Sequence, residues 1–333
     1  MKRNARGTWR GKESVSVDTG TLWEAFLGRG VTRREFFRLS SGAALVLGAG
    51  TPLVVPGVVC AGGVPDVAVV TGSAARAVRA AVSMLGGMPS FVKKGDKVVI
   101  KPNMSFAQGP ASATNTSPEV VRELVAMCRE AGASKIRVLD HPLRPGGLCV
   151  KDIRDACLVF GGDLVHALEE ESFYREATVP GAKTLRRTEV MKDVLEADVL
   201  IAAPVAKSHG STGVSLSMKG MMGLVYSRGV MHFLHDLSTA VVDLASLLKP
   251  KLVVIDGSLV LSTRGPGGPG KVIRADTVIA SRDMVAADAQ AVSMFEWYGQ
   301  RMEPRQVKHI RLAHERGLGR MDLGALNIGK KNV

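Results

Sequence analysis

Lysine, histidine and aspartate side chains follow two apolar runs that have the character of β-strands. Lys207-Ser208-His209 comes after the run 199–202, and Asp256 comes directly after the run 252–255. A lysine can neutralise a carboxylate or phosphate, a histidine can move a proton near neutral pH, and an aspartate can orient a base or bind a cation. The sequence therefore predicts Lys207, His209 and Asp256 as catalytic residues. For each of them taken singly, an ordinary turn is the alternative.

Further residues have the chemistry to hold an anionic ligand. Lys101-Pro102-Asn103 ends the run 97–101, and Thr116 precedes Ser117-Pro118, which has the pattern of a helix start whose free amides favour anions. Gly267 lies in the glycine- and proline-rich segment 264–270, where backbone can approach a ligand closely. The predicted ligand-binding residues are Lys101, Asn103, Thr116, Lys219 and Gly267. Helix capping and a surface turn are the alternative interpretations.

Three histidines fall between positions 209 and 235, and His232 and His235 have the spacing that puts two side chains on one face of a helix. His209, His232 and His235 are therefore candidate ligands of a divalent metal, although no H-E-x-x-H motif is present. Capping or core hydrogen bonds are the alternative. The four cysteines, Cys60, Cys128, Cys149 and Cys157, show no C-x-x-C spacing, so the sequence predicts no iron–sulfur cluster.

The elements that must position these residues alternate along the chain. Strands are expected at 67–70, 97–101, 135–140, 199–202, 252–255 and 278–280, and helices at 74–85, 118–131, 150–160, 237–248, 284–297 and 304–316. This pattern predicts an α/β fold, Rossmann-like, with a mostly parallel sheet and helices on both faces, built as one domain or two lobes. The carboxyl ends of parallel strands share one edge of a sheet. We therefore expect Lys101, Lys207 and His209 in one pocket, with Asp256 as the acid nearest to the two lysines.

The first 61 residues have the features of an export signal. Arg33-Arg34 precedes Phe36, Phe37 and Arg38, and an apolar run rich in glycine and proline then extends to Cys60. Paired arginines before such a run are typical of a twin-arginine signal, which predicts the twin-arginine translocase as a partner and a periplasmic or otherwise exported protein. Cleavage near residue 61 would leave a domain over 62–325 and a tail over 326–333. Without cleavage, the leader would serve as a membrane anchor.

The charge balance favours an acidic ligand. The chain has 333 residues with a net charge of +13; the leader holds nine of the 44 basic and four of the 31 acidic residues, so residues 62–333 carry a net charge of +8. Such a surface suits anionic small molecules. Only 5% of the residues are aromatic, and none of the basic stretches is interleaved with aromatic residues, which argues against nucleic acid.

The order of these motifs, from about Val67 to Gly319, resembles the uncharacterised family known as domain of unknown function 362. The resemblance rests on 101–103, 116–118, 197–209, 218–220, 256–257, 265–268 and 283–288. Relatives usually have Lys-Asn where this chain has Lys219-Gly220, and many carry a ferredoxin-like cysteine module that this chain lacks. The resemblance implies an α/β domain and names no reaction.

Three hypotheses on function remain open at this point. The first is an exported enzyme with a site for an anionic small molecule or a metal, in which the lysines hold the anion. The second is a periplasmic redox or cofactor-handling accessory that depends on a redox partner protein. The third is a solute-binding module.

Overall fold

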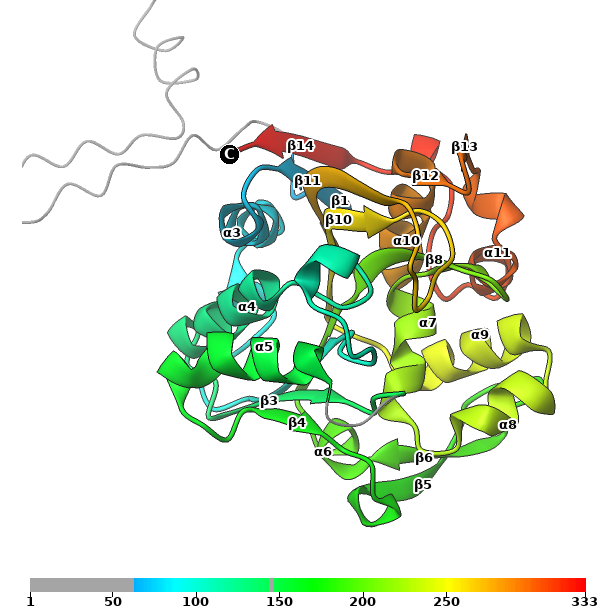
Figure 1. The fold of residues 1–333 in the computed structure, drawn as a ribbon, viewed down its shortest axis with the longest axis horizontal. Coiled ribbons are helices and arrows are strands. Elements are labelled where there is room, and N and C mark those ends of the chain that lie inside the picture. Colours follow the sequence, from blue (N-terminus) through cyan, green and yellow to red (C-terminus); the bar gives the residue numbers. More distant parts are fainter. Residues whose placement is uncertain (1–62, 144–146) are drawn as a thin grey trace, which may run out of the picture. The chain divides into compact units, whose positions relative to one another are not determined.

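A ten-stranded sheet forms the centre of the part of the chain that the computed structural model describes, residues 63–143 and 147–333 (Figure 1). Along the sheet the strands follow the order β14-β1-β11-β10-β7-β2-β3-β4, and β8 pairs with both β10 and β9. The leader predicted for residues 1–61 lies outside the described residues. The strands are β1 (Val67–Thr71), β2 (Lys97–Pro102), β3 (Lys135–Asp140), β4 (Val165–Ala167), β7 (Val199–Ala203), β8 (Val205–His209), β9 (Gly213–Ser215), β10 (Leu252–Leu261), β11 (Val272–Ser281) and β14 (Ile328–Asn332).

Most strands of this sheet run in the same direction. The pairs β10–β7, β7–β2, β2–β3, β3–β4, β1–β14 and β10–β8 are parallel. Strand β11 is antiparallel to both of its neighbours, β1 and β10, and β9 is antiparallel to β8. The predicted mostly parallel α/β sheet is confirmed.

Helices cover both faces of the sheet, because its strands are apolar on both sides. Val67 and Val69 of β1 belong to one buried cluster, whereas Ala68 and Val70 belong to the other. One face packs against α3 (Ala74–Met84), α4 (Pro118–Glu130) and α5 (Leu148–Cys157). The other face packs against α9 (Leu237–Leu247), α10 (Met284–Met294) and α11 (Lys308–Glu315). The described residues group into one compact unit rather than two lobes.

Smaller elements complete the described structure. Strands β5 (Tyr174–Thr178) and β6 (Arg187–Met191) form one antiparallel pair, and β12 (Glu296–Trp297) and β13 (Gln300–Arg301) form another. Three short helices, α6 (Lys192–Leu195), α7 (Ser217–Gly220) and α8 (Arg228–Phe233), connect larger elements. Within the described ranges, every helix is too short or too polar to cross a bilayer.

Local sequence accounts for several helix ends. The Ser117 hydroxyl accepts a hydrogen bond from the amide of Glu119 at the start of α4, and Pro118 occupies the first helical position. Gly132, with φ of +88°, follows the end of the same helix in a left-handed conformation that glycine adopts easily. The Asp283 carboxylate accepts from the amides of Val285 and Ala286 and so starts α10.

Several strand boundaries differ from the sequence prediction, and β11, expected at 278–280, already begins at Val272. Residues 205–209, expected as the loop after a strand, form β8, a separate strand after Pro204. Strand β10 does not end at Ile255 but continues to Leu261, with a change of register between Gly257 and Leu259, so Asp256 lies inside a strand. The predicted C-terminal tail contains β14, which pairs with β1 at the edge of the sheet.

Candidate functional site

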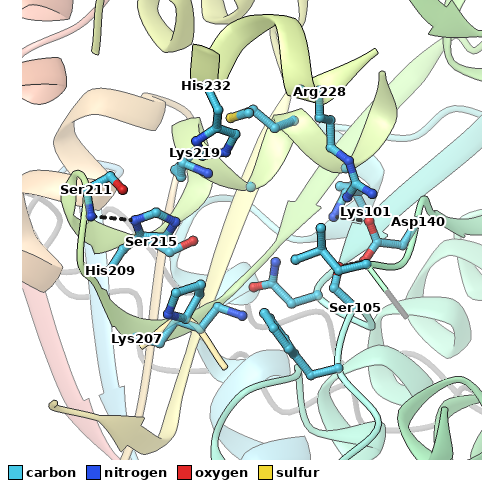
Figure 2. A pocket seen from close by; sticks show the side chains of 18 of the residues that line it. Lys101, Ser105, Asp140, Lys207, His209, Ser211, Ser215, Lys219, Arg228 and His232 are labelled. Atoms are coloured by element: carbon cyan, nitrogen blue, oxygen red, sulfur yellow. Dashed lines mark hydrogen bonds and ion pairs between the residues drawn. The ribbon is translucent and has the colours of Figure 1, made fainter. Parts of the chain in front are cut away.

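A cavity of about 750 Å³ opens beyond the carboxyl ends of β2, β3 and β8 (Figure 2). Its volume is within the usual range for small-molecule sites. Four cationic side chains line it, Lys101, Lys207, Lys219 and Arg228, against one carboxylate, that of Asp140. Its other lining residues include Asn103, Ser105, Phe106, Leu143, His209, Ser211, Ser215, Met222, Gly223, Tyr226, His232, Phe233 and Pro266.

Lys101 and Asp140 form a buried ion pair at the ends of adjacent strands β2 and β3. The Lys101 Nζ lies 3.0 Å from Asp140 Oδ1 and also donates to the Pro102 carbonyl. Asp140 Oδ2 accepts from the backbone amide of Met104 at 2.8 Å and from the Ser105 hydroxyl at 3.0 Å. Burial lowers the pKa of Lys101, while the Asp140 charge acts in the opposite direction. Asp140 is therefore committed to this pair and to the loop after β2.

Gly223 allows this pair to sit against the backbone of the turn Met221–Leu224. A Cβ at position 223 would lie 2.1 Å from Asp140 Oδ1 and 2.8 Å from Lys101 Nζ. Both distances are far below contact distance. Only a glycine is compatible with the pair as it stands.

Lys207, in β8, reaches across to the loop before α4. Its Nζ donates to the carbonyl oxygen of Thr114 at 2.5 Å and lies 4.7 Å from the centroid of the Phe106 ring. A cation over an aromatic face is an attractive arrangement. The ammonium of Lys207 is thus held by protein groups at the cavity wall.

Lys219 differs from the other cationic residues of the cavity. Its side chain is 8% exposed, and no hydrogen bond or ion pair involves it in the described part of the chain. Burial and the nearby Arg228 lower its pKa from 10.5 to about 8. At neutral pH this is a buried ammonium without a counter-charge.

The position of Lys219 is fixed by helix α7. The buried carboxylate of Asp288, in α10, accepts from the amides of Ser217 and Met218 and from the Ser217 hydroxyl. These contacts satisfy amides at the start of α7. Burial raises the pKa of Asp288 to about 7.

Arg228, the first residue of α8, is anchored through its guanidinium. Nη1 donates to the His141 carbonyl at 2.6 Å, and Nη2 donates to the Pro142 carbonyl at 3.1 Å. Both acceptors are neutral, and Arg228 forms no ion pair within the described residues. Burial lowers the pKa of Arg228, while the nearby Asp140 acts in the opposite direction.

His209, at the end of β8, is a neutral hydrogen-bond donor rather than a charged group. Burial, followed by Lys219 and His232, lowers its pKa to about 3. The Ser211 amide donates to Nδ1 at 3.2 Å. Because Nδ1 accepts, the proton of the neutral ring resides on Nε2.

The predicted three-histidine metal site is not assembled. The rings of His209 and His232 stack with centroids 6.4 Å apart, and His232 lines the cavity, whereas His235 does not. Across the described residues, no group of three or more His, Cys, Asp or Glu side chains is placed to hold a metal ion. A different histidine, His309 of α11, is fully buried, and neither of its ring nitrogens has a hydrogen-bond partner among the residues that the structure describes.

Of the predicted catalytic and ligand-binding residues, five line the cavity: Lys101, Asn103, Lys207, His209 and Lys219. Asp256, Thr116 and Gly267 do not. The Asp256 carboxylate accepts from the amides of Ser117 and Ser258, and burial raises its pKa. It ties β10 to the start of α4, so the acid beside Lys101 is Asp140 and not Asp256.

Thr116 and Gly267 also have structural contacts. The Thr116 hydroxyl donates to the Ala203 carbonyl and accepts from the Asn103 amide, which joins the loop after β2 to β7. At Gly267, a Cβ would lie 2.9 Å from the Phe106 ring. Gly267 therefore supports the ring of Phe106, which itself lines the cavity.

Several lining residues were not predicted as site residues, among them Asp140, Arg228, Ser211 and Ser215. Asp140 was recognisable as a polar residue at a strand end. Arg228 had no comparable signal, because it begins a short helix far from any predicted strand end. Its place at the cavity follows from the fold of residues 217–233.

Comparisons with known proteins identify the family and leave its activity open. The model of the family called domain of unknown function (DUF362) matches residues 98–293, so the chain belongs to this family. The thylakoid-associated protein sll1697 of Synechocystis is 28% identical over 226 residues, which cover 65% of this chain and 68% of that protein. The lactate racemase apoprotein of Thermoanaerobacterium thermosaccharolyticum matches with a TM-score of 0.39 and 14% identity, over 65% of this chain and 54% of that one.

Proposed function

We propose that this chain is an enzyme that binds a small molecule bearing a carboxylate or phosphate group in the cavity beside β2, β3 and β8. The observation that carries the proposal is the charge balance of the cavity wall, four cationic side chains against one carboxylate. That carboxylate, Asp140, is already paired with Lys101. An anionic ligand would supply the missing counter-charge.

Different residues of the cavity wall contact different parts of the ligand. Lys219 and Arg228 hold the anionic group, since neither forms an ion pair with an acidic side chain of the described residues, and the one acid of the cavity wall, Asp140, is paired with Lys101. His209 offers its Nε2–H as a neutral donor to a ligand oxygen. Lys101 and Asp140 hold the loop that carries Ser105 and Phe106.

The remaining wall suits an apolar or planar portion of the ligand. Phe106, Leu143, Tyr226 and Phe233 contribute apolar surface, and Phe233 is 88% exposed at the cavity. Apolar walls with a few placed polar groups are usual for small-molecule sites. We expect a ligand with an anionic group at one end and an apolar body at the other.

The export signal predicted for residues 1–61 supports a location outside the cytoplasm. The Arg33-Arg34 pair supports export by the twin-arginine translocase, so the enzyme would act outside the cytoplasm.

Calorimetric titration with inorganic phosphate and with citrate, at constant ionic strength, tests this function. We expect Lys219→Gln to weaken binding at least tenfold, because a hydrogen bond from a charged donor contributes about 1.5–3 kcal/mol. Lys249→Gln is the matched control, because Lys249 is exposed and remote from the cavity lining. Equal weakening by both variants, or no binding of either anion by the unmodified protein, would refute the proposal.

A further inference from the structure

We propose that Lys219 is a nucleophile that forms an imine with the carbonyl carbon of an anionic aldehyde or 2-oxo acid bound in the cavity. This inference rests on the proposed function and adds the class of substrate and the bond that forms.

The first support is the surroundings of the Lys219 amine. It lines the cavity, is 8% exposed, and has no hydrogen bond or ion pair within the described residues. Lys101 is occupied by Asp140, and Lys207 donates to the Thr114 carbonyl. Lysines that form imines are typically desolvated and lie beside another cationic group. Lys219 meets both conditions, with Arg228 as the neighbouring cation.

The second support is the fixed position of Lys219. Asp288 and Ser217 hold the start of α7, so the backbone that carries Lys219 is anchored to the long helix α10. Figure 2 shows Lys219 on the same side of the cavity as His209 and His232, with Lys101, Asp140 and Arg228 on the other side. A 2-oxo acid between the two sides can present its carboxylate to Arg228 and to the protonated Lys219, and its adjacent carbonyl carbon to the free amine of Lys219.

The third support is the set of neutral imidazoles around Lys219. Burial lowers the pKa of His209 and of His309 to about 3 in each case, and the Lys219 charge contributes to both shifts. The other charged groups near this cluster are Lys207 and Arg228. All these neighbours are cationic or neutral. They disfavour the ammonium form of Lys219, and a fraction of about one tenth is free amine at pH 7.

The reaction balances without a further reagent. The lone pair of Nζ forms a bond to the carbonyl carbon, and the π electrons move to the carbonyl oxygen. A proton shifts from nitrogen to that oxygen, through water or by exchange at the His209 Nε2–H. The carbon–oxygen bond then breaks, and a second proton leaves the nitrogen with the departing oxygen. The net change is amine plus carbonyl giving imine plus water.

Trapping by cyanoborohydride reduction tests the inference on the full chain. The protein is incubated separately with pyruvate and with pyridoxal phosphate at pH 7, and modified lysines are located by peptide mass spectrometry. The two probes distinguish a carboxylate from a phosphate as the anchoring group. We expect Lys219 to be modified at least fivefold more than the exposed Lys249 by one or both probes, and excess inorganic phosphate to suppress that modification.

Two variants serve as controls. Lys219→Arg keeps the positive charge but removes the amine, so the adduct should disappear while phosphate binding measured by calorimetry persists. Lys249→Arg, at an exposed position outside the cavity lining, should leave the adduct at Lys219 in place. Modification of Lys249 above Lys219 by both probes, or an adduct on Lys101 or Lys207 instead, would overturn the inference. Phosphate binding without an adduct would refute imine formation and leave the proposed function standing, whereas absence of binding by phosphate and by both probes would refute the function itself.

Discussion

Replacing Lys219 by methionine should stabilise the folded protein at neutral pH. Methionine keeps the length and the apolar stem of lysine and removes the buried charge. Lys219 forms no ion pair within the described part of the chain, and the one acid that lines the cavity, Asp140, is paired with Lys101, so no ion pair is lost with the substitution. The substitution should also abolish phosphate binding. A substitution that raises stability and abolishes binding indicates that the original residue serves function rather than folding.

The size of the gain follows from the pKa of Lys219. Its pKa falls from 10.5 to about 8 on folding. Since one pH unit corresponds to about 1.4 kcal/mol, keeping the ammonium charged in the fold costs about 3 kcal/mol. That value is the upper limit, because methionine fills the space imperfectly. We expect an increase of about 1–3 kcal/mol in the free energy of unfolding.

The gain should depend on pH in a defined direction. Between pH 8 and 10.5 the unfolded state holds a proton on Lys219 that the folded state has released, so the unmodified protein gains stability as pH rises through this window. The difference in the free energy of unfolding between the variant and the unmodified protein should therefore be constant below pH 8. It should then decrease to near zero at about pH 10.5.

Urea denaturation at pH 7 and at pH 10 measures this difference directly. Lys249→Met is the control, because Lys249 is exposed and has no hydrogen bond or ion pair within the described residues; its effect should stay within about 0.5 kcal/mol. A Lys219→Met protein that unfolds at lower urea than the unmodified protein at pH 7 would show that Lys219 contributes stability. The account of an uncompensated charge would then be wrong.

Three other predictions concern separate parts of the chain. Gly223→Ala should destabilise the fold by roughly 3 kcal/mol in urea denaturation, because the new Cβ overlaps Asp140 and disrupts a buried ion pair. Gly220→Ala is the control: its Cβ would lie 3.8 Å from the nearest atom, and it should change stability by less than about 1 kcal/mol. An equal effect of the two substitutions would contradict this. The His209 ring should show no titration between pH 5 and 8 by NMR, since its pKa is about 3, and a titration near pH 6.5 would count against a neutral donor. Phosphate binding should weaken as the pH rises through about 8, because Lys219 then loses its proton. Changing Arg33 and Arg34 together to lysine should leave the protein in the cytoplasm in a fractionation experiment, and normal export would refute the twin-arginine signal.

The sequence predicted strands that contain several branched apolar residues and missed one that contains few. Strands β2, β3 and β7 each contain three Val, Ile or Leu residues and were located to within a residue or so. Strand β8 holds Lys207, Ser208 and His209, all buried, so its pattern resembled a loop. Its polar groups are tolerated because they are paired or face the cavity. Periodicity alone does not reveal such a strand.

The order of strands in the sheet explains the error at Asp256. Both Asp140 and Asp256 were visible in the sequence at the ends of predicted strands. In the sheet, β3 is the neighbour of β2, whereas β10 is separated from β2 by β7. Asp140 therefore reaches Lys101, and Asp256 does not. Because strand order is set by long-range packing, the sequence pattern predicted the edge at which the lysines meet but not which acid meets them.

The residues around Lys219 explain why its charge remains buried although it lowers the stability of the fold. Asp288, itself fully buried, accepts three hydrogen bonds from the first residues of α7. This anchoring prevents the short helix from turning Lys219 out to solvent, where its charge would cost little. Gly223 in the following turn lets the Lys101 and Asp140 pair approach the backbone, which occupies the acid that Lys219 would otherwise attract. The fold thus places the Lys219 ammonium in the cavity without an ion-pair partner from the described chain. This arrangement lowers the stability of the folded protein, and binding of an anion would supply the counter-charge.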